Sequence, residues 1–196
     1  MPRSARRALP SRVLSVVSGW WIDLRFRWST TNKAPFVVVL LVAGISASLI
    51  AGFNHIAGAM SAAQERQKNL TCLALNVYHE ARGEPLAGQY AVAEVTMNRV
   101  ASGRFPGTVC GAVYQKEWDY LRKRYVGAFS WTEFDKLPRP SGQQWARAWR
   151  VAETVYSGGY TPRLKGALYY HALYARPSWS GEKRRVAAIG NHVFYR

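Results

Sequence analysis

An apolar stretch in the first third of the sequence constrains this chain more than any other feature. From Ala34 to Gly52 nearly every residue is apolar, and no Asp, Glu, Lys or Arg follows until Glu65. About 18 such residues form a helix of roughly 27 Å, close to the hydrocarbon thickness of a bilayer. A wholly buried core helix has a similar composition, so the flanking residues decide between the two.

Those flanks favour a membrane anchor. Residues 1–34 carry seven basic residues against Asp23 alone, a net charge of +6. The positive-inside rule then keeps the N-terminus in the cytoplasm and exports the rest of the chain. We therefore expect a basic cytoplasmic and juxtamembrane segment over 1–34, a single transmembrane helix over 35–53, a linker over 54–70 and an extracytoplasmic domain over 71–196.

A cleaved signal peptide is the alternative to this anchor. Ala57-Gly58-Ala59 resembles a small-residue cleavage site, but the basic region is long for a signal peptide. Trp20, Trp21 and Trp28 also fit the aromatic belt of a membrane interface. We expect a single-pass protein of the inner (cell) membrane, with its domain in the periplasm or on an equivalent outer face.

Export changes how the two cysteines are interpreted. Cys72 and Cys110 both follow the apolar stretch, and two cysteines in an oxidising compartment are a candidate disulfide. Two buried free thiols are the alternative. Neither cysteine belongs to a spacing typical of zinc ligands, so we expect no metal site and no cofactor.

The exported part has a net charge of +10 from residue 61 onward. Such a charge attracts polyanions. Outside the cytoplasm nucleic acid is excluded as the expected partner, which leaves anionic wall polymer and phospholipid head groups. Charge alone selects no substrate.

Residues 71–78 are predicted to form a short amphipathic helix that leads into the segment 79–84. Thr71 or Asn69 is a candidate N-cap. Gly83 and Pro85 are expected to end the helix shortly after Glu80.

Glu80 shares one face of this helix with Leu73 and Val77, so its carboxyl group is expected to be sheltered. It also lies in the last turn, where the helix dipole is negative. Both effects raise the pKa of a carboxyl group, and a carboxyl group that keeps its proton can act as a general acid. The alternative is a glutamate on the solvated edge of an ordinary helix.

The rest of the domain is predicted to have helices first and strands last. Together with a cleft between the two parts, this indicates an α+β fold. The expected elements are helices over 87–100, 108–114 and 143–156, an irregular loop over 116–140, a strand over 167–171, and a hairpin of 185–189 with 192–195 across Gly190-Asn191.

Several segments, in the same order, resemble the SleB/CwlJ cell wall hydrolase family over about residues 71–196. They are Tyr78 to Pro85, Gly88-Gln89 through Val95, Asn98 to Val100, Phe105-Pro106 to Val109-Cys110, Val113 to Gln115, Phe129 to Thr132, Tyr170 to Ala172, Arg176 to Trp179 and Ile189 to Tyr195.

The resemblance implies a lysozyme-like helical lobe with a small antiparallel β element, and cleavage of peptidoglycan glycan strands at the MurNAc-GlcNAc bond. By motif position, the catalytic acid/base of the family falls on Glu80. Lytic transglycosylation needs only this carboxyl group, because the C6 hydroxyl of the sugar is the nucleophile, whereas ordinary glycosidases use a second carboxylate. The sequence does not separate transglycosylation from hydrolysis.

Other residues of the matching motifs are expected to line the cleft and contact the substrate. Glu84 is a candidate second carboxylate, or a hydrogen-bond partner or surface residue instead. Instead of contacting substrate, Trp131 could be part of the core. His171 could instead form a hydrogen bond with a buried backbone group. Trp179 and His192 are expected to be structural. The full substrate-binding set is Glu84, Gln115, Ser130, Trp131, Tyr170 and His171.

The sequence also allows two other functions. A zinc-dependent amidase or endopeptidase would use His79, Glu80, His171 and His192 as ligands, although the helix lacks a histidine at the fourth position after His79. A non-catalytic wall-binding protein would grip glycan through its aromatic side chains and would tolerate Glu80→Gln.

Overall fold

The computed structural model describes residues 32–120 and 122–196. The chain divides into two compact units, residues 1–58 and 59–196. Apart from residues 32–34, the predicted basic segment and its tryptophans lie outside the described residues.

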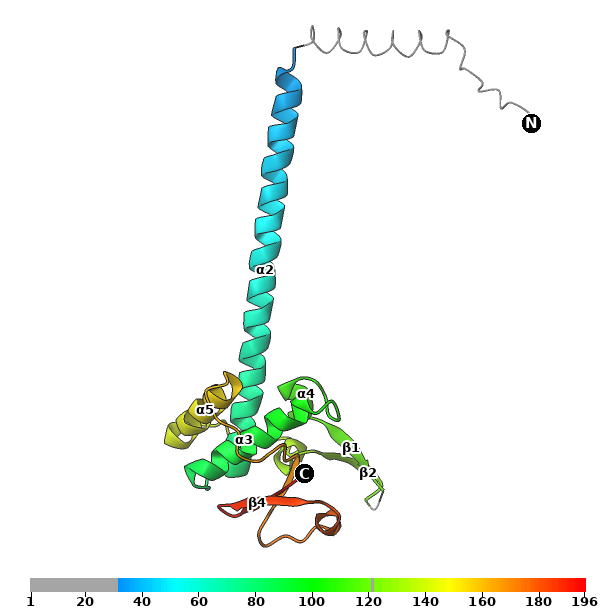
Figure 1. The fold of residues 1–196 in the computed structure, drawn as a ribbon, viewed down its shortest axis with the longest axis vertical. Coiled ribbons are helices and arrows are strands. Elements are labelled where there is room, and N and C mark those ends of the chain that lie inside the picture. Colours follow the sequence, from blue (N-terminus) through cyan, green and yellow to red (C-terminus); the bar gives the residue numbers. More distant parts are fainter. Residues whose placement is uncertain (1–31, 121) are drawn as a thin grey trace, which may run out of the picture. The chain divides into compact units, whose positions relative to one another are not determined.

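Figure 1 labels the elements, which keep its numbering here. In chain order they are α2 (Ala34–Ala81), α3 (Leu86–Ala101), α4 (Val109–Val113), β1 (Lys116–Asp119), β2 (Arg124–Gly127), the 3-10 turn η1 (Ser130–Glu133), α5 (Gly142–Tyr156), β3 (Tyr169–Ala172), the 3-10 turn η2 (Ser178–Gly181), β4 (Arg185–Ile189) and β5 (His192–Tyr195).

The first unit holds the apolar part of α2. Its side chains are exposed, with Leu40 and Phe53 each at 72%. By length and composition α2 could cross a membrane, and its most apolar stretch has a mean hydropathy of 2.5. A signal sequence near the N-terminus passes the same test. The transmembrane anchor therefore stays a prediction.

The helix expected to begin near Thr71 is the end of α2, so the predicted cap is wrong. Thr71 Oγ1 donates to the carbonyl of Gln67 at 2.8 Å, one turn earlier in the same helix. Residues 54–70, expected to be a linker, are helical throughout. They contain Gly58 but no proline and many good helix formers, so no residue ends the helix before the predicted stop. That stop is confirmed, because α2 ends at Ala81.

Helix α3 lies between the two hydrophobic clusters of the domain. On one side, Ala93 packs with residues of α2, α4, η1 and α5, including Leu73 and Val77. On the other side, Ala91 and Val95 pack with Leu164, Ala167 and Phe194. The predicted helices over 87–100, 108–114 and 143–156 are confirmed as α3, α4 and α5. The helical lobe and the sheet therefore share one central helix.

The predicted disulfide is present. Cys72 of α2 and Cys110 of α4 are bonded, with their Cα atoms 5.2 Å apart. In the chain-entropy model, closing a loop of this length stabilises a fold by about 4 kcal/mol. The bond therefore holds the last turns of α2, which carry Glu80, against α4.

The closing sheet has the strand order β3-β5-β4, and both pairs are antiparallel. The predicted hairpin across Gly190-Asn191 is confirmed as β4–β5, and the predicted strand over 167–171 as β3. Tyr170 pairs with Phe194, and His171 pairs with Val193. Since side chains alternate along a strand, Tyr170 and His171 lie on opposite faces of this sheet.

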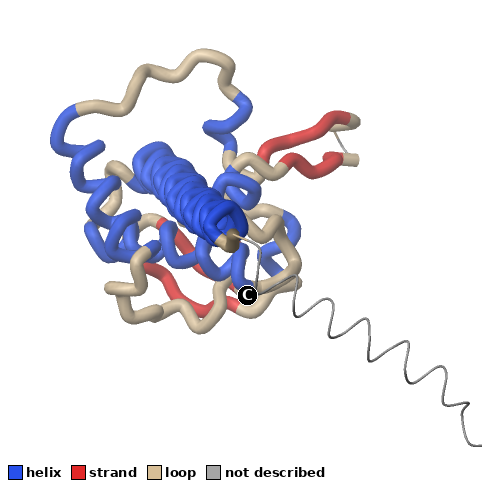
Figure 2. Tube along the Cα trace, turned by 90° about the horizontal axis from the view of Figure 1, so that it is seen from above, coloured by secondary structure: helices blue, strands red, loops and turns tan. Residues whose placement is uncertain are grey.

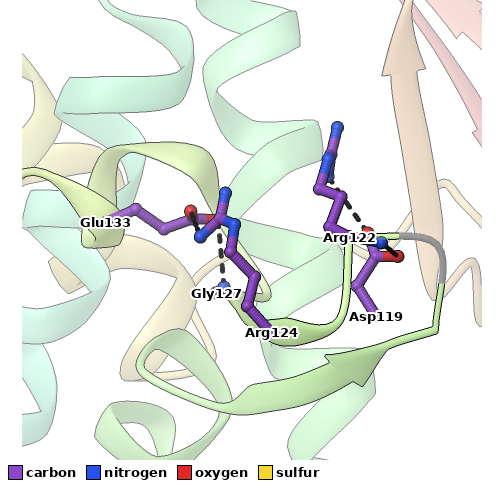
Figure 3. A network of polar contacts seen from close by, with 5 residues as sticks. All are labelled: Asp119, Arg122, Arg124, Gly127 and Glu133. Atoms are coloured by element: carbon purple, nitrogen blue, oxygen red, sulfur yellow. Dashed lines mark hydrogen bonds and ion pairs between the residues drawn. The ribbon is translucent and has the colours of Figure 1, made fainter.

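The segment 116–140, expected to be irregular, contains a second hairpin, β1–β2. Figure 2 shows it extending away from the helices, unlike β3, β4 and β5. Glu133 of η1 accepts hydrogen bonds from Arg124 Nη1 at 2.7 Å and Gly127 N at 3.1 Å, which fastens β2 to η1 (Figure 3). Both strands are short and mostly exposed, so they have no alternating apolar pattern from which this hairpin could be predicted.

Candidate active site

Glu80 in the last turn of α2 meets Tyr170 of β3 at the join between helix and sheet. The Tyr170 hydroxyl donates a hydrogen bond to Glu80 Oε2 at 3.0 Å. These residues are 90 positions apart in the sequence. Two of the residues expected in the cleft are therefore in direct contact.

The surroundings of Glu80 favour its protonated form. Burial raises the pKa of Glu80 above its ordinary value, and this outweighs the hydrogen bond from Tyr170 and the charge of Arg99, which both lower it. Burial also raises the pKa of Tyr170 well above its ordinary value. Tyr170 therefore stays a hydrogen-bond donor while Glu80 can hold or release a proton.

Arg99 of α3 is a buried cation beside this pair. Its Nε donates to the carbonyl of Leu168 at 2.8 Å, and its guanidinium group lies over the rings of Phe105 and Phe129 at 5.1 and 4.9 Å. Burial lowers the pKa of Arg99, although its ordinary value is high enough for the charge to remain. The charge favours a carboxylate at Glu80 once the proton has left.

A cavity of about 460 Å³ opens beside the Glu80–Tyr170 pair. Tyr170 and Arg99 line this cavity, and aromatic side chains are typical of surfaces that bind sugars by stacking. The other lining residues are Phe105, Glu117, Val126, Gly127, Ala128, Tyr169, Trp179 and Lys183. The predicted cleft therefore lies between the β1–β2 hairpin and the closing sheet.

Glu84 is held elsewhere, by the turn of the β4–β5 hairpin. Its two carboxylate oxygens accept hydrogen bonds from Asn191, at 2.7 Å from the backbone nitrogen and 3.1 Å from Nδ2. His192 Nδ1 lies 3.8 Å from the same carboxylate. A Cβ atom at Gly190 would collide with Glu84 Oε2. Of the alternatives for Glu84, this geometry favours a hydrogen-bond partner over a group that contacts substrate.

The remaining candidates have different surroundings. Trp131 is 8% exposed, donates from Nε1 to Asn76 and stacks on His79, so it occupies the core position that was its alternative. Gln115 donates to Glu117 at 2.9 Å and so reaches the cavity through that residue. Ser130 is exposed at the start of η1.

His171 points to the other face of the sheet. Its Nε2 lies 2.9 Å from the Tyr195 hydroxyl, and its Nδ1 lies 2.9 Å from the carbonyl of Ala172. His171 also packs edge-on against Trp179. Trp179, expected to be structural, lines the cavity, whereas His192 is buried in β5 as expected.

The residues proposed as zinc ligands are not brought together. His79 stacks on Trp131, and His171 lies beside Tyr195. Within residues 32–120 and 122–196, no three histidine, cysteine, aspartate or glutamate side chains are grouped so as to hold a metal ion. The zinc alternative has no geometric support in this part of the chain.

Sequence reasoning missed Arg99, Glu117, Tyr169 and Lys183, which all line the cavity. Arg99 follows Asn98 in a motif used for the resemblance, but a basic residue near a helix end ordinarily faces solvent. Glu117 comes from the segment that was expected to be an irregular loop, and Lys183 lies outside the motifs that carry the resemblance. No local pattern marks such residues.

Comparisons with known proteins agree with this fold. The family described as Cell Wall Hydrolase matches residues 83–195, a range that begins three residues after Glu80. The catalytic domain of the germination-specific lytic transglycosylase SleB from Bacillus anthracis is 30% identical, with a TM-score of 0.53 over 66% of this chain and 95% of that one. The shared fold is a mixed one, with helices and a small antiparallel sheet.

Two curated relatives are spore cortex-lytic enzymes. That of Bacillus cereus is 29% identical over 128 residues, and that of Oceanobacillus iheyensis is 30% identical over 128 residues. Each alignment covers 65% of this chain but only 44% and 41% of the respective relative, so the chain spans less than half of their length. The family match itself covers more than half of this chain, and the chain belongs to the SleB/CwlJ-type cell wall hydrolase family.

Proposed function

We propose that this chain cleaves peptidoglycan glycan strands at the MurNAc-GlcNAc bond by lytic transglycosylation, with Glu80 as acid and then base. The observation that carries the proposal is the sheltered Glu80 carboxyl group, held by Tyr170 beside an aromatic-lined cavity. The related SleB domain, named a lytic transglycosylase, supports the same reaction.

In the first step Glu80 protonates the glycosidic oxygen as its bond to C1 of MurNAc breaks. Tyr170 occupies Oε2, so Oε1 is the oxygen from which the proton leaves. The resulting carboxylate keeps the hydrogen bond from Tyr170 and lies near the charge of Arg99. Both interactions stabilise the negative charge that the transfer creates.

In the second step the C6 hydroxyl of the same MurNAc attacks C1, and Glu80 takes the hydroxyl proton. The 1,6-anhydro product forms, the acid is restored, and no water is consumed. The chemistry uses no metal and no cofactor. A second carboxylate is unnecessary because the substrate supplies the nucleophile.

The mass of the released product tests this function. Full-length protein in detergent is incubated with purified sacculi, and the muropeptides are weighed. A product lighter by one water than the reducing sugar is expected, and the reducing sugar itself would indicate hydrolysis. Glu80→Gln serves as the control, and undiminished release by that variant would refute the assignment of Glu80.

We further propose that residues 35–53 anchor the chain in the inner (cell) membrane, with the N-terminus in the cytoplasm and the domain outside. The basic residues of 1–34, the exposed apolar face of α2 and the disulfide support this topology. Protease added to spheroplasts should digest the domain and spare the N-terminal segment. A mature protein that begins near residue 60 would show instead that a signal peptide is cleaved.

A further inference from the structure

A second hollow, separate from the catalytic cavity, lies where the ends of the closing sheet meet the loop before β3. Its volume is about 140 Å³, and it shares no lining residue with the larger cavity. All but one of its lining residues are basic. They are Arg163, Lys165, Arg184, Arg185, Val186 and Arg196, and we call this site the basic hollow.

The backbone holds these residues in place. Arg184 and Arg196 exchange two backbone hydrogen bonds, at 3.0 and 3.2 Å. Arg163 N donates to Glu94 Oε2 at 2.9 Å, next to the fully buried Leu164. Three segments that are distant in the sequence are therefore fixed around one space.

The five basic side chains of the hollow are not paired with acidic side chains among the described residues. The nearby Glu94 does not line the hollow, because its two oxygens accept hydrogen bonds from the backbone of Arg163 and Leu164. Like charges held close together repel one another and attract an anion.

The polymer of the proposed function carries anionic groups that fit the charge of the basic hollow. Within residues 59–196, the part of α2 that begins at residue 59 lies at one end, and β4 lies at the other end, beyond α3 (Figure 1). Peptidoglycan carries carboxylates on its stem peptides, and arginine binds carboxylates with two parallel hydrogen bonds.

We propose that the basic hollow is a second, non-catalytic binding site for peptidoglycan that takes the carboxylates of the stem peptides. The proposal rests on the proposed function, because it assumes the same polymer in the catalytic cavity. The hollow is too small for a disaccharide but large enough for a carboxylate group. It holds the polymer by its peptides while the cavity cleaves its glycan.

Binding to sacculi tests this site without cleavage. Arg184→Gln/Arg185→Gln is combined with Glu80→Gln in the full-length protein, and binding is measured by co-sedimentation. The matched control is Arg147→Gln/Arg150→Gln on exposed positions of α5, which removes the same charge. We expect the hollow variant to bind about five- to tenfold more weakly at low salt, the control to change by less than about twofold, and the difference to shrink at high salt.

Chemical treatment of the sacculi identifies the anion. Amidation of the stem-peptide carboxylates should remove the difference between the two double variants, whereas acid removal of phosphate-bearing polymers should leave it intact. Equal binding by both double variants, or a difference that depends on phosphate, would overturn the proposal. Lys165→Gln gives a second test if the double variant is unstable, and muropeptide release by the unaltered protein tests the proposed function separately.

Discussion

Glu80 and Glu84 lie four residues apart, on either side of the end of α2, and the fold uses their carboxylates differently. Glu80 accepts a hydrogen bond from a tyrosine that lines the cavity. Glu84 accepts two hydrogen bonds from Asn191, and its side chain is only 9% exposed. The carboxyl group of Glu80 has one oxygen, Oε1, that Tyr170 does not contact, whereas the carboxylate of Glu84 fixes the closing hairpin to the end of α2.

The difference shows how one short motif can provide both the proposed catalytic group and a structural contact. Ala81, Arg82 and Gly83 end the helix and turn the chain, so the two carboxyl groups point to different parts of the sheet. Asn191 lies in the turn between β4 and β5, whereas Tyr170 lies in β3, and the contacts of the two glutamates orient these two parts of the sheet relative to α2. We therefore expect substitution of Glu80 to lower mainly the activity, and substitution of Glu84 to lower mainly the stability.

The largest effect is expected from Glu80→Gln. Removing a positioned general acid lowers a rate by about 10²- to 10⁴-fold, so muropeptide release should fall by that factor. The unfolding midpoint in urea should change little or rise, since a buried group that favours its neutral form is replaced by a neutral one. Release at the unaltered rate would contradict the assignment of Glu80 as the general acid.

Glu84→Gln should show the opposite pattern. It weakens two hydrogen bonds made by a largely buried charge, which we expect to lower the free energy of unfolding by about 2 kcal/mol. Muropeptide release below the unfolding temperature should largely persist. Loss of release at unchanged stability would assign Glu84 to the chemistry instead.

A glycine pair provides the matched test of the same contact. Gly190→Ala introduces a Cβ that meets Glu84 Oε2, whereas Gly103→Ala has open space around it. Both glycines have positive φ, +58° and +67°, so both variants carry the same backbone strain. We expect Gly190→Ala to be the less stable of the two, and equal stability would contradict a tight turn against Glu84.

Tyr170→Phe should shift the pH dependence. The hydrogen bond from Tyr170 lowers the pKa of Glu80, so its loss raises that pKa further and keeps Glu80 protonated to higher pH. The alkaline limb of kcat/KM should move to higher pH, while kcat falls by about tenfold because the carboxylate loses a donor. If the alkaline limb of kcat/KM stays in place or moves to lower pH, Tyr170 does not control the pKa of the catalytic acid.

Glu117→Gln should have the smallest effect. Glu117 is the carboxylate among the residues that line the cavity, and hydrolysis with a second carboxylate would need a group of this kind. Transglycosylation does not, so the anhydro product should persist in the muropeptide mass spectrum. A variant that loses a reducing-sugar product would identify Glu117 as the base of a hydrolase.

The local elements were predictable, but the contacts between them were not. Periodicity and Gly-Asn turn chemistry located α3, α5 and the β4–β5 hairpin within a few residues. The sheltered face of Glu80 followed from Leu73 and Val77, which are fully buried. These features depend on neighbours within a few positions.

The rest depends on residues that are far apart in the sequence. Trp131 was expected to have either a substrate or a core role, and only its hydrogen bond to Asn76, 55 residues away, decides in favour of the core. Arg99 becomes part of the site because its position in α3 places its guanidinium group over the rings of Phe105 and Phe129. The continuation of α2 through residues 54–70 was not predicted, because a long helix can pass from an apolar to a polar stretch without a break.

The strand order β3-β5-β4 has a consequence for the sequence of events during folding. The strand that is synthesised last sits in the middle, so neither β3 nor β4 has a strand partner until β5 inserts between them. Tyr170 on β3 therefore reaches Glu80 only in a late step, after the helices have formed. If the proposed function is right, a chain whose sheet is incomplete would hold Glu80 without its partner Tyr170, and it would threaten the cell's own envelope only once the sheet is complete.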